Sequence, residues 1–339
     1  MNSHTNTLNS TYNLAGLFTL SLRLVAGWTY FSALWRRVVL TNKLDPELPG
    51  YIGEKFNHFL PNALGIGPII EYMLENPDVL YFNMVAFTII EGVVGLFFIF
   101  GLFTRLSSIA VMGLALGILL GAGWIGTTCL DEWQIGVLGI AAGFTIFFSG
   151  GGYFSLDYYL ANKKGWFASK KAAFLTSGIL ALNSKKLKQI SIFGALGILG
   201  LTLFTNQVFH GGLWGELHNK SVSPKLEISN LVLENEQLSF QVYRVEGVDV
   251  YGSFLIKMEV LNQQKEAIYS LGADDLANFD TSKIENKYIA KVKPGAHALI
   301  LPLGAKANLN IDLSAIQLHE AKYLKLTDVS GKSWTAKVQ

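Results

Sequence analysis

Two ionisable residues, Arg23 and Glu91, lie in the middle of strongly apolar stretches of the sequence. A charged side chain at membrane depth is costly and usually faces the interior of a helix bundle, where it finds a partner. Arg23 is about 10 residues and Glu91 about 12 residues from the same end of their stretches, so at about 1.5 Å per residue their depths are similar. We therefore predict that the two side chains meet, either as a structural ion pair or as a catalytic site for proton transfer or quinone binding.

The segment 127–133 is a second group of side chains that could do chemistry. Its thiol, Cys129, is a candidate catalytic residue, although most single cysteines are buried and inert and the neighbouring acids oppose a thiolate. Arg36 and Arg37 could compensate, and their paired hydrogen bonds suit a small anion as well as a lipid headgroup. The candidate substrate-binding residues are Arg36, Arg37, Trp28, Trp124, Asp131, Glu132, Trp133 and His58.

Some of these candidates have simpler explanations. Tryptophan prefers the membrane interface whether or not it binds a ligand, and His58 fits a surface histidine as well as a proton carrier. His210 and His218 could shuttle protons or bind a metal, but their spacing is a weak metal signal. We favour interfacial packing for these two histidines.

Composition excludes several classes of protein. The chain has 339 residues, of which 50% are hydrophobic and 15% charged, and its net charge of +2 gives no reason to expect a nucleic-acid partner. A single cysteine forms no internal disulfide and holds neither an iron–sulfur cluster nor a cysteine-rich zinc site. No haem, flavin or metal site is evident, so we expect any electrons to pass through a bound molecule such as a quinone.

The elements that position these residues are predicted to be membrane helices. About 20 apolar residues in a helix cross a bilayer core of about 30 Å. The stretches that meet or approach this length are residues 14–35, 82–103, 106–124, 133–148 and 190–209. The first contains no basic n-region of a signal peptide, so we expect it to be retained as a spanning helix.

Basic residues predict the orientation. The segment between the fourth and fifth stretches is rich in lysine and has no acidic residue. Its lysines are Lys163, Lys164, Lys170, Lys171, Lys185, Lys186 and Lys188. The positive-inside rule places this segment in the cytoplasm and the end of the chain outside, although Arg36, Arg37 and Lys43 count against this orientation.

The remaining segments differ from the membrane stretches in the spacing of their apolar residues. The long outer loop 36–81 contains two short helical patterns, at 51–59 and 69–74, between prolines. From about Lys225 apolar residues alternate with polar ones, which predicts antiparallel strands of a β-sandwich. Glycines at 113, 117 and 121 and at 136, 139 and 143 predict close helix packing in lipid.

The predicted fold is an α-helical membrane bundle of four helices plus a fifth transmembrane helix, followed by an all-β, sandwich-like extracytoplasmic domain. The predicted boundaries are 1–160 for the four-helix domain, 161–189 for the cytoplasmic basic loop, 190–209 for the fifth helix and 210–339 for the β-domain.

Several motifs resemble one membrane family. Glu91, Gly92 and Gly95, followed by GLFTR at 101–105, resemble the second-helix signature of the DoxX/DoxD family, and Arg23, Gly27 and Trp28 resemble its first. The segment TTCLDEWQIG at 127–136 resembles the more specific DoxD version, and HGGLWGELHNKSVSP at 210–224 resembles the start of DoxA. The whole chain thus resembles a DoxD/DoxA fusion, the two subunits of thiosulfate:quinone oxidoreductase.

This resemblance implies a membrane enzyme that oxidises thiosulfate to tetrathionate on the outer face and reduces membrane quinone. Its implied partners are the lipid bilayer, quinone, a small sulfur oxyanion and a second copy of the chain, in a bacterial or archaeal cytoplasmic membrane. The alternative is a non-catalytic membrane subunit or scaffold of the DoxX type whose β-domain docks a partner. A transporter is less favoured because the sequence shows neither an internal repeat nor a pair of broken helices.

Overall fold

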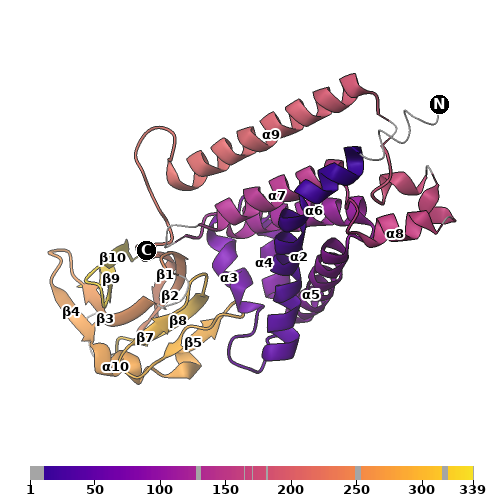
Figure 1. Cartoon of the computed structure of the whole chain (residues 1–339). Coiled ribbons are helices and arrows are strands. Elements are labelled where there is room, and N and C mark those ends of the chain that lie inside the picture. Colours follow the sequence, from indigo (N-terminus) through magenta and orange to yellow (C-terminus); the bar gives the residue numbers. More distant parts are fainter. Residues whose placement is uncertain are drawn as a thin grey trace. The chain divides into compact units, whose positions relative to one another are not determined.

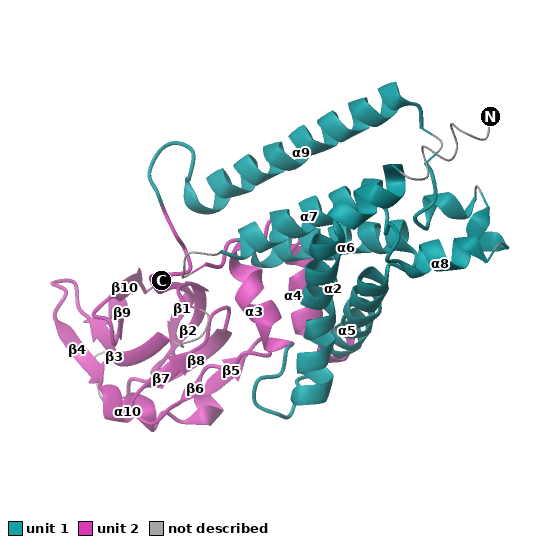
Figure 2. Cartoon of the chain, viewed as in Figure 1, with its two compact units in different colours: residues 1–52, 81–123, 130–217 teal, residues 53–80, 124–129, 218–339 magenta. Residues whose placement is uncertain are grey.

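A computed structural model describes residues 11–126, 131–163, 165–169, 171–180, 182–248, 253–314 and 320–338. The chain divides into two compact units (Figure 2). The helical unit comprises residues 1–52, 81–123 and 130–217, and the β-rich unit comprises residues 53–80, 124–129 and 218–339.

The helical unit contains the predicted membrane spans (Figure 1). Four helices of the described chain are long and apolar enough to cross a membrane: α5 (Pro77–Phe100), α6 (Thr104–Ala122), α7 (Glu132–Ser149) and α9 (Ser184–His210). Shorter elements join them: α8 (Leu156–Asn162), η3 (Trp166–Ala168) and η4 (Ala172–Phe174). The predicted helical membrane region is confirmed.

The first span is broken rather than straight. Helical residues Thr11–Phe18 and Leu20–Leu40 meet at 54°, and the second part consists of α2 (Leu20–Leu34) and the π-helix η1 (Trp35–Leu40). At the bend the Thr19 hydroxyl lies 3.1 Å from the Ala15 carbonyl and 2.9 Å from the Ser149 hydroxyl. Threonine bonds of this kind to the preceding turn bend helices. The helix therefore changes direction at Thr19 and extends five residues beyond the predicted end at Trp35.

Small residues let α2 and α5 pack closely. A Cβ at Gly95 would collide with the backbone of Phe31, and one at Gly92 would collide with Leu34. Side chains of α2, α5, α6 and α7 fill a common apolar core of Tyr30, Val94, Phe98, Val111, Leu114 and Ile146. In lipid, such close packing replaces the hydrophobic effect as the main attraction between helices.

The two predicted glycine rows behave differently. Gly136, Gly139 and Gly143 of α7 lie directly against α6, where a Cβ would meet Leu119, Ala115 or Met112. At Gly113 and Gly117 a Cβ would meet no atom of the described chain within 4 Å. The prediction of close packing is therefore confirmed for the α7 row and wrong for these two glycines, because they lie on the face of α6 turned away from its neighbours.

The β-rich unit is a sandwich of two antiparallel sheets (Figure 1). One has the order β1-β2-β8-β5, and the other β10-β9-β3-β7-β6, with β4 paired to β3. The strands are β1 (Lys225–Glu234), β2 (Gln237–Glu246), β3 (Ser253–Leu261), β4 (Ala267–Leu271), β5 (Ile284–Asn286), β6 (Lys293–Pro294), β7 (Leu299–Leu301), β8 (Lys306–Asp312), β9 (Tyr323–Asp328) and β10 (Ser333–Lys337). Helix α10 (Ala273–Ala277) and η5 (Thr281–Lys283) follow β4. Leu238, Leu255 and Leu309, from both sheets, share one core, so the predicted sandwich is confirmed.

Three segments distant in sequence meet in the β-rich unit. The outer-loop elements α3 (Glu54–Phe59), η2 (Leu60–Asn62) and α4 (Gly67–Glu75) pack with the sheets. Asn57 is fully buried and donates to Gly304 O (3.1 Å) while accepting from Ala290 N (3.0 Å). Gly126 N donates to Ser221 Oγ at 2.9 Å. Residues 53–80 of the outer loop, which the sequence-based boundaries placed with the membrane domain, thus fold with the β-domain, whereas residues 36–52 belong to the helical unit.

This arrangement constrains how the chain crosses the membrane. Residues 53–80, 124–126 and 218 onward must lie on one side, because they form one unit. Two long apolar helices, α5 and α6, lie between residues 53–80 and residues 124–126. Two more, α7 and α9, lie between residues 124–126 and the segment that begins at 218. Each pair therefore leaves and returns to the same side, as the predicted topology requires.

Candidate functional site

The helical unit contains a nearly buried ion pair near the end of its first span. Arg37 Nη1 of η1 lies 2.5 Å from Glu91 Oε2 of α5 and 3.2 Å from Thr88 Oγ1, one helical turn before Glu91. The Glu91 side chain is 5% exposed and that of Arg37 is 19% exposed. Glu91 therefore has the partner that a carboxylate at membrane depth requires.

The predicted pairing of Arg23 with Glu91 is wrong. Arg23 Nη1 donates to Gly151 O at 2.7 Å, and Nη2 donates to Phe154 O at 2.5 Å. The guanidinium lies against Gly101, where a Cβ would collide with it. Gly101 follows Glu91 by ten residues, or about 15 Å of helix. The two predicted catalytic charges are thus at different depths.

Two features of the first span explain the error. The bend at Thr19 leaves Arg23 only four residues from the point where the helix changes direction. The extension through η1 carries Arg37 along α5 to the level of Glu91. The predicted depths assumed a straight helix, and this assumption led to Arg23 instead of Arg37 as the partner of Glu91.

A contact between a histidine and a carboxylate joins the ends of α7 and α9. His210 Nε2 lies 3.3 Å from Asp131 Oδ2, and both side chains are largely buried. Asp131 begins α7, where its backbone N–H donates to Gln134 Oε1 at 2.9 Å. The structure thus gives Asp131 a histidine partner that no local sequence pattern indicates. Cys129 lies outside the described residues.

The other predicted substrate-binding residues come from several elements of the two units. Arg36 is exposed, and its Nε donates to Ser32 O of its own helix at 3.3 Å. Trp28 is 56% exposed on α2, whereas Trp133 is buried on α7. Trp124 and His58 belong to the β-rich unit, where Trp124 Nε1 donates to Phe59 O at 3.1 Å. Glu132 is half-buried in the first turn of α7.

A third polar group lies where α6 begins, and no local sequence pattern indicates its central residue. The Asp157 carboxylate accepts from the backbone nitrogens of Phe103 (2.8 Å) and Thr104 (2.9 Å). It also accepts from the hydroxyls of Thr104 (2.7 Å) and Ser177 (2.9 Å). A carboxylate stabilises a helix N-terminus by bonding its unpaired N–H groups. Asp157 therefore fixes the turn between α5 and α6.

Arg105 completes this group. It is fully buried and donates to Phe147 O (2.9 Å), Thr176 O (2.7 Å) and Ala173 O. The motif GLFTR at 101–105 thus builds a turn, with Gly101 and Phe103 at positive φ, and supplies an arginine that ties α7 to the following segment. The position of this motif indicates a structural role.

Among the residues that the structure describes, no group of three or more histidine, cysteine, aspartate or glutamate side chains is placed to hold a metal ion. In the helical unit, the Arg37–Glu91 pair and the Thr88 hydroxyl beside it offer a candidate site for chemistry. A carboxylate beside a guanidinium and a hydroxyl can bind a carbonyl compound and move a proton.

These features define a polytopic membrane protein with a buried charge pair and an attached β-sandwich. Residues 18–183 match the family described as TQO small subunit DoxD, and residues 209–337 match the family described as TQO small subunit DoxA. The chain belongs to these two families, joined in that order, which confirms the resemblance found in its motifs. TQO denotes thiosulfate:quinone oxidoreductase. No solved structure matches the chain.

Proposed function

We propose that this chain oxidises thiosulfate to tetrathionate and passes the electrons to a membrane quinone. The family match over both parts of the chain supports this reaction. In it, two thiosulfate ions lose one electron each and join through a new S–S bond, while one quinone takes up two electrons and two protons. The chain must therefore bind an apolar carbonyl compound, supply protons to it, and hold a small dianion nearby.

The ion pair of Arg37 and Glu91 is the observation that carries the proposed quinone site. A quinone reaches a helix bundle from the lipid, and its carbonyl oxygens accept hydrogen bonds. The Arg37 guanidinium, which is 19% exposed, and the buried Thr88 hydroxyl lie together beside Glu91 and carry hydrogen-bond donors. Glu91 lies within hydrogen-bond distance of Arg37 and can hold a proton for transfer to a reduced oxygen. Arg23, whose donors are bonded to two backbone carbonyls, is not part of this proposal.

We place the sulfur anion beside the same ion pair, since electrons pass most readily between molecules in contact. Arg36 is exposed next to Arg37 and offers a second guanidinium to a dianion. Cys129, Asp131, Glu132, Trp133, Trp28, Trp124 and His58 stay predictions for substrate binding. The lysine-rich segment 163–188 supports an extracytoplasmic position for the η1 end of the first span and for the β-domain.

The test compares Glu91→Gln with a matched carboxylate on the same helix. The full chain is purified, placed in lipid nanodiscs and given thiosulfate and decylubiquinone, and quinone reduction and tetrathionate are both measured. We expect Glu91→Gln to lower the rate about 100-fold, as loss of a proton-transfer group does. Asp78→Asn, which changes an exposed acid in the first turn of α5, should retain the wild-type rate.

Two results would contradict the proposal. Thiosulfate-dependent quinone reduction at the wild-type rate in Glu91→Gln would remove the ion pair from the reaction. The complete absence of such reduction in the folded wild-type protein would favour the alternative, a non-catalytic membrane subunit whose β-domain docks a partner. The three-segment construction of the β-rich unit is compatible with that alternative.

A further inference from the structure

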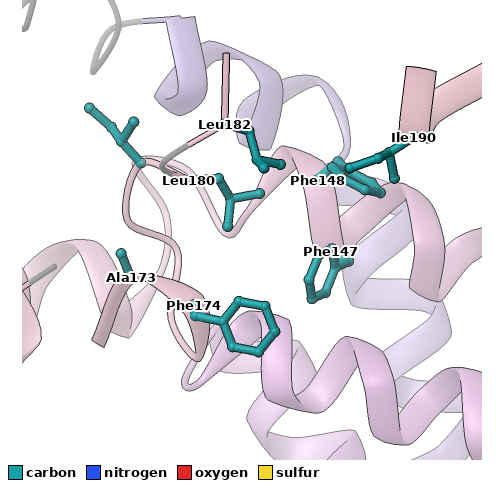
Figure 3. A pocket seen from close by; sticks show the side chains of 8 residues that line it. Phe147, Phe148, Ala173, Phe174, Leu180, Leu182 and Ile190 are labelled. Atoms are coloured by element: carbon teal, nitrogen blue, oxygen red, sulfur yellow. The ribbon is translucent and has the colours of Figure 1, made fainter. Parts of the chain in front are cut away.

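A pocket of about 400 Å³ lies at the end of the helical unit opposite to Arg37 (Figure 3). It is lined by the end of α7, by η4 with the segment that follows it, and by the start of α9. Its lining residues are Phe147, Phe148, Ala173, Phe174, Ile179, Leu180, Leu182 and Ile190. Its volume is within the range of about 300–1,000 Å³ that is usual for ligand sites.

The pocket is held open by the surrounding structure. Arg105, which is fully buried, bonds to the backbone carbonyls of Phe147 and Ala173 on two different walls. The Phe147 and Phe174 rings meet edge to face, with centroids 6.0 Å apart. A guanidinium that bonds several carbonyls fixes their spacing. The walls therefore cannot close on each other without breaking buried hydrogen bonds.

The lining chemistry selects a hydrocarbon chain as occupant. The side chains in Figure 3 carry only carbon, so none of them can donate to a carbonyl oxygen. A quinone ring needs a few polar groups to orient it, as ligands of this size usually do. An acyl chain needs none, and its transfer into such a pocket follows the hydrophobic effect.

The residues beside the pocket select the headgroup. Lys185, Lys186 and Lys188 are exposed in the first turns of α9, between the lining residues Leu182 and Ile190. Lys186 precedes Ile190 by four residues, so both lie on the same face of the helix. No acidic residue occurs from 158 to 215. Lysines beside an apolar pocket between membrane helices suit an anionic lipid headgroup.

We propose that this pocket binds one acyl chain of an anionic phospholipid whose phosphate contacts Lys186, while Lys185 and Lys188, farther round the helix, add to the positive charge near it. The lipid fills the space between α7 and α9, beside their contact at Gly194 and Phe144. It thereby fastens the first half of α9, whose buried residues Thr205, Phe209 and His210 all lie near its other end. This site is independent of the proposed oxidoreductase activity.

Native mass spectrometry of the full chain in detergent tests the proposal. The protein is incubated with dioleoyl phosphatidylglycerol or dioleoyl phosphatidylcholine, and retained lipid is counted. We expect about tenfold or more preference for phosphatidylglycerol, since each lysine near an anionic lipid contributes to binding. Lys185→Gln/Lys186→Gln/Lys188→Gln should remove this preference. Exchange of three exposed lysines in the β-domain, Lys291→Gln/Lys332→Gln/Lys337→Gln, should leave it unchanged.

A second variant pair tests the pocket itself. Ile190→Trp fills it with a larger side chain and should abolish retention, whereas Ile192→Trp, on an exposed position of α9 outside the lining, should retain lipid as the wild type does. Equal retention of both lipids by the wild type would overturn the assigned headgroup. Equal retention of phosphatidylglycerol by the two tryptophan variants, or a quinone as the molecule that Ile190→Trp displaces, would overturn the site.

Discussion

The helical unit carries hydrogen-bonded arginines near both ends of its first span, and they differ in what they bond. At the Thr19 end, Arg23 and Arg105 donate to backbone carbonyls, and the nearby Asp157 is saturated by two amides and two hydroxyls. At the other end, Arg37 bonds to two side chains, Glu91 and Thr88.

This difference distinguishes arginines that hold the fold together from an arginine that can take part in chemistry. A guanidinium bonded to backbone carbonyls fixes the positions of chain segments, and its bonds break only when the fold opens. A guanidinium bonded to side chains can exchange partners when a rotamer changes, so a ligand can compete for it. We therefore expect changes near Asp157 to alter stability and changes near Glu91 to alter turnover.

Asp157→Ala should have the largest effect on stability. It removes four hydrogen bonds to a buried carboxylate and leaves the start of α6 without its cap, which should lower the free energy of unfolding by about 3 kcal/mol. Thermal unfolding of the detergent-purified protein measures the change. Asp78→Ala, an exposed acid at the start of α5, is the control and should change it little. Equal effects of the two variants would show that Asp157 does not fix the turn.

Gly101→Ala tests the same end through the backbone. Gly101 has φ of +62°, and an added Cβ would collide with the Arg23 guanidinium. We expect a loss of about 2 kcal/mol in unfolding free energy, because strain and displacement of Arg23 add. Gly113→Ala, where a Cβ meets open space, should be neutral or stabilise α6 by up to about 1 kcal/mol. An unchanged unfolding free energy in Gly101→Ala would mean that the Arg23 side chain can move aside without loss of stability.

The elements of this fold were predictable because their signals are local. Apolar runs and period-two alternation depend on neighbouring residues, and they located the membrane helices and strands. In β3 the alternation holds only in part: Leu255 and Met258 are both buried, because the pairing with β9 shifts between Leu255 and Lys257. Such a bulge moves later side chains to the other face.

The partners of the charged residues were not predictable from local patterns. Arg37 and Glu91 are 54 positions apart, as are Phe103 and Asp157. The bend at Thr19, which shifts every depth along the first span, lies where the Thr19 hydroxyl bonds to Ala15 O and to Ser149, which is 130 positions away. The sequence thus identified Glu91 correctly as a buried charge and assigned it the wrong arginine.

Exchange of arginine for lysine should affect the two ends differently. Arg23→Lys keeps the charge but cannot reach the Gly151 and Phe154 carbonyls with a planar fork, so it should lose about 1–2 kcal/mol of stability. The turnover of the folded fraction should stay at the wild-type value. Arg37→Lys keeps a cation beside Glu91 and should unfold near the wild-type temperature while turnover falls. The comparison fails if Arg23→Lys lowers turnover more than Arg37→Lys does.

Thr88→Val should give the smallest effect and sharpen the comparison most. Valine has nearly the shape of threonine, so it removes only the hydroxyl that Arg37 contacts at 3.2 Å. Because the bond to Glu91 remains, we expect turnover to fall only a few-fold, in line with about 1 kcal/mol for one hydrogen bond. Ser177→Ala removes one of the four bonds to Asp157 and the bond that the Ser177 hydroxyl accepts from Gly151 N (2.7 Å), so it should lower stability by about 1–2 kcal/mol with unchanged turnover. Thermal unfolding and quinone reduction are measured for both variants. If both variants changed the same property, stability or turnover, the two ends of the first span would not differ in role.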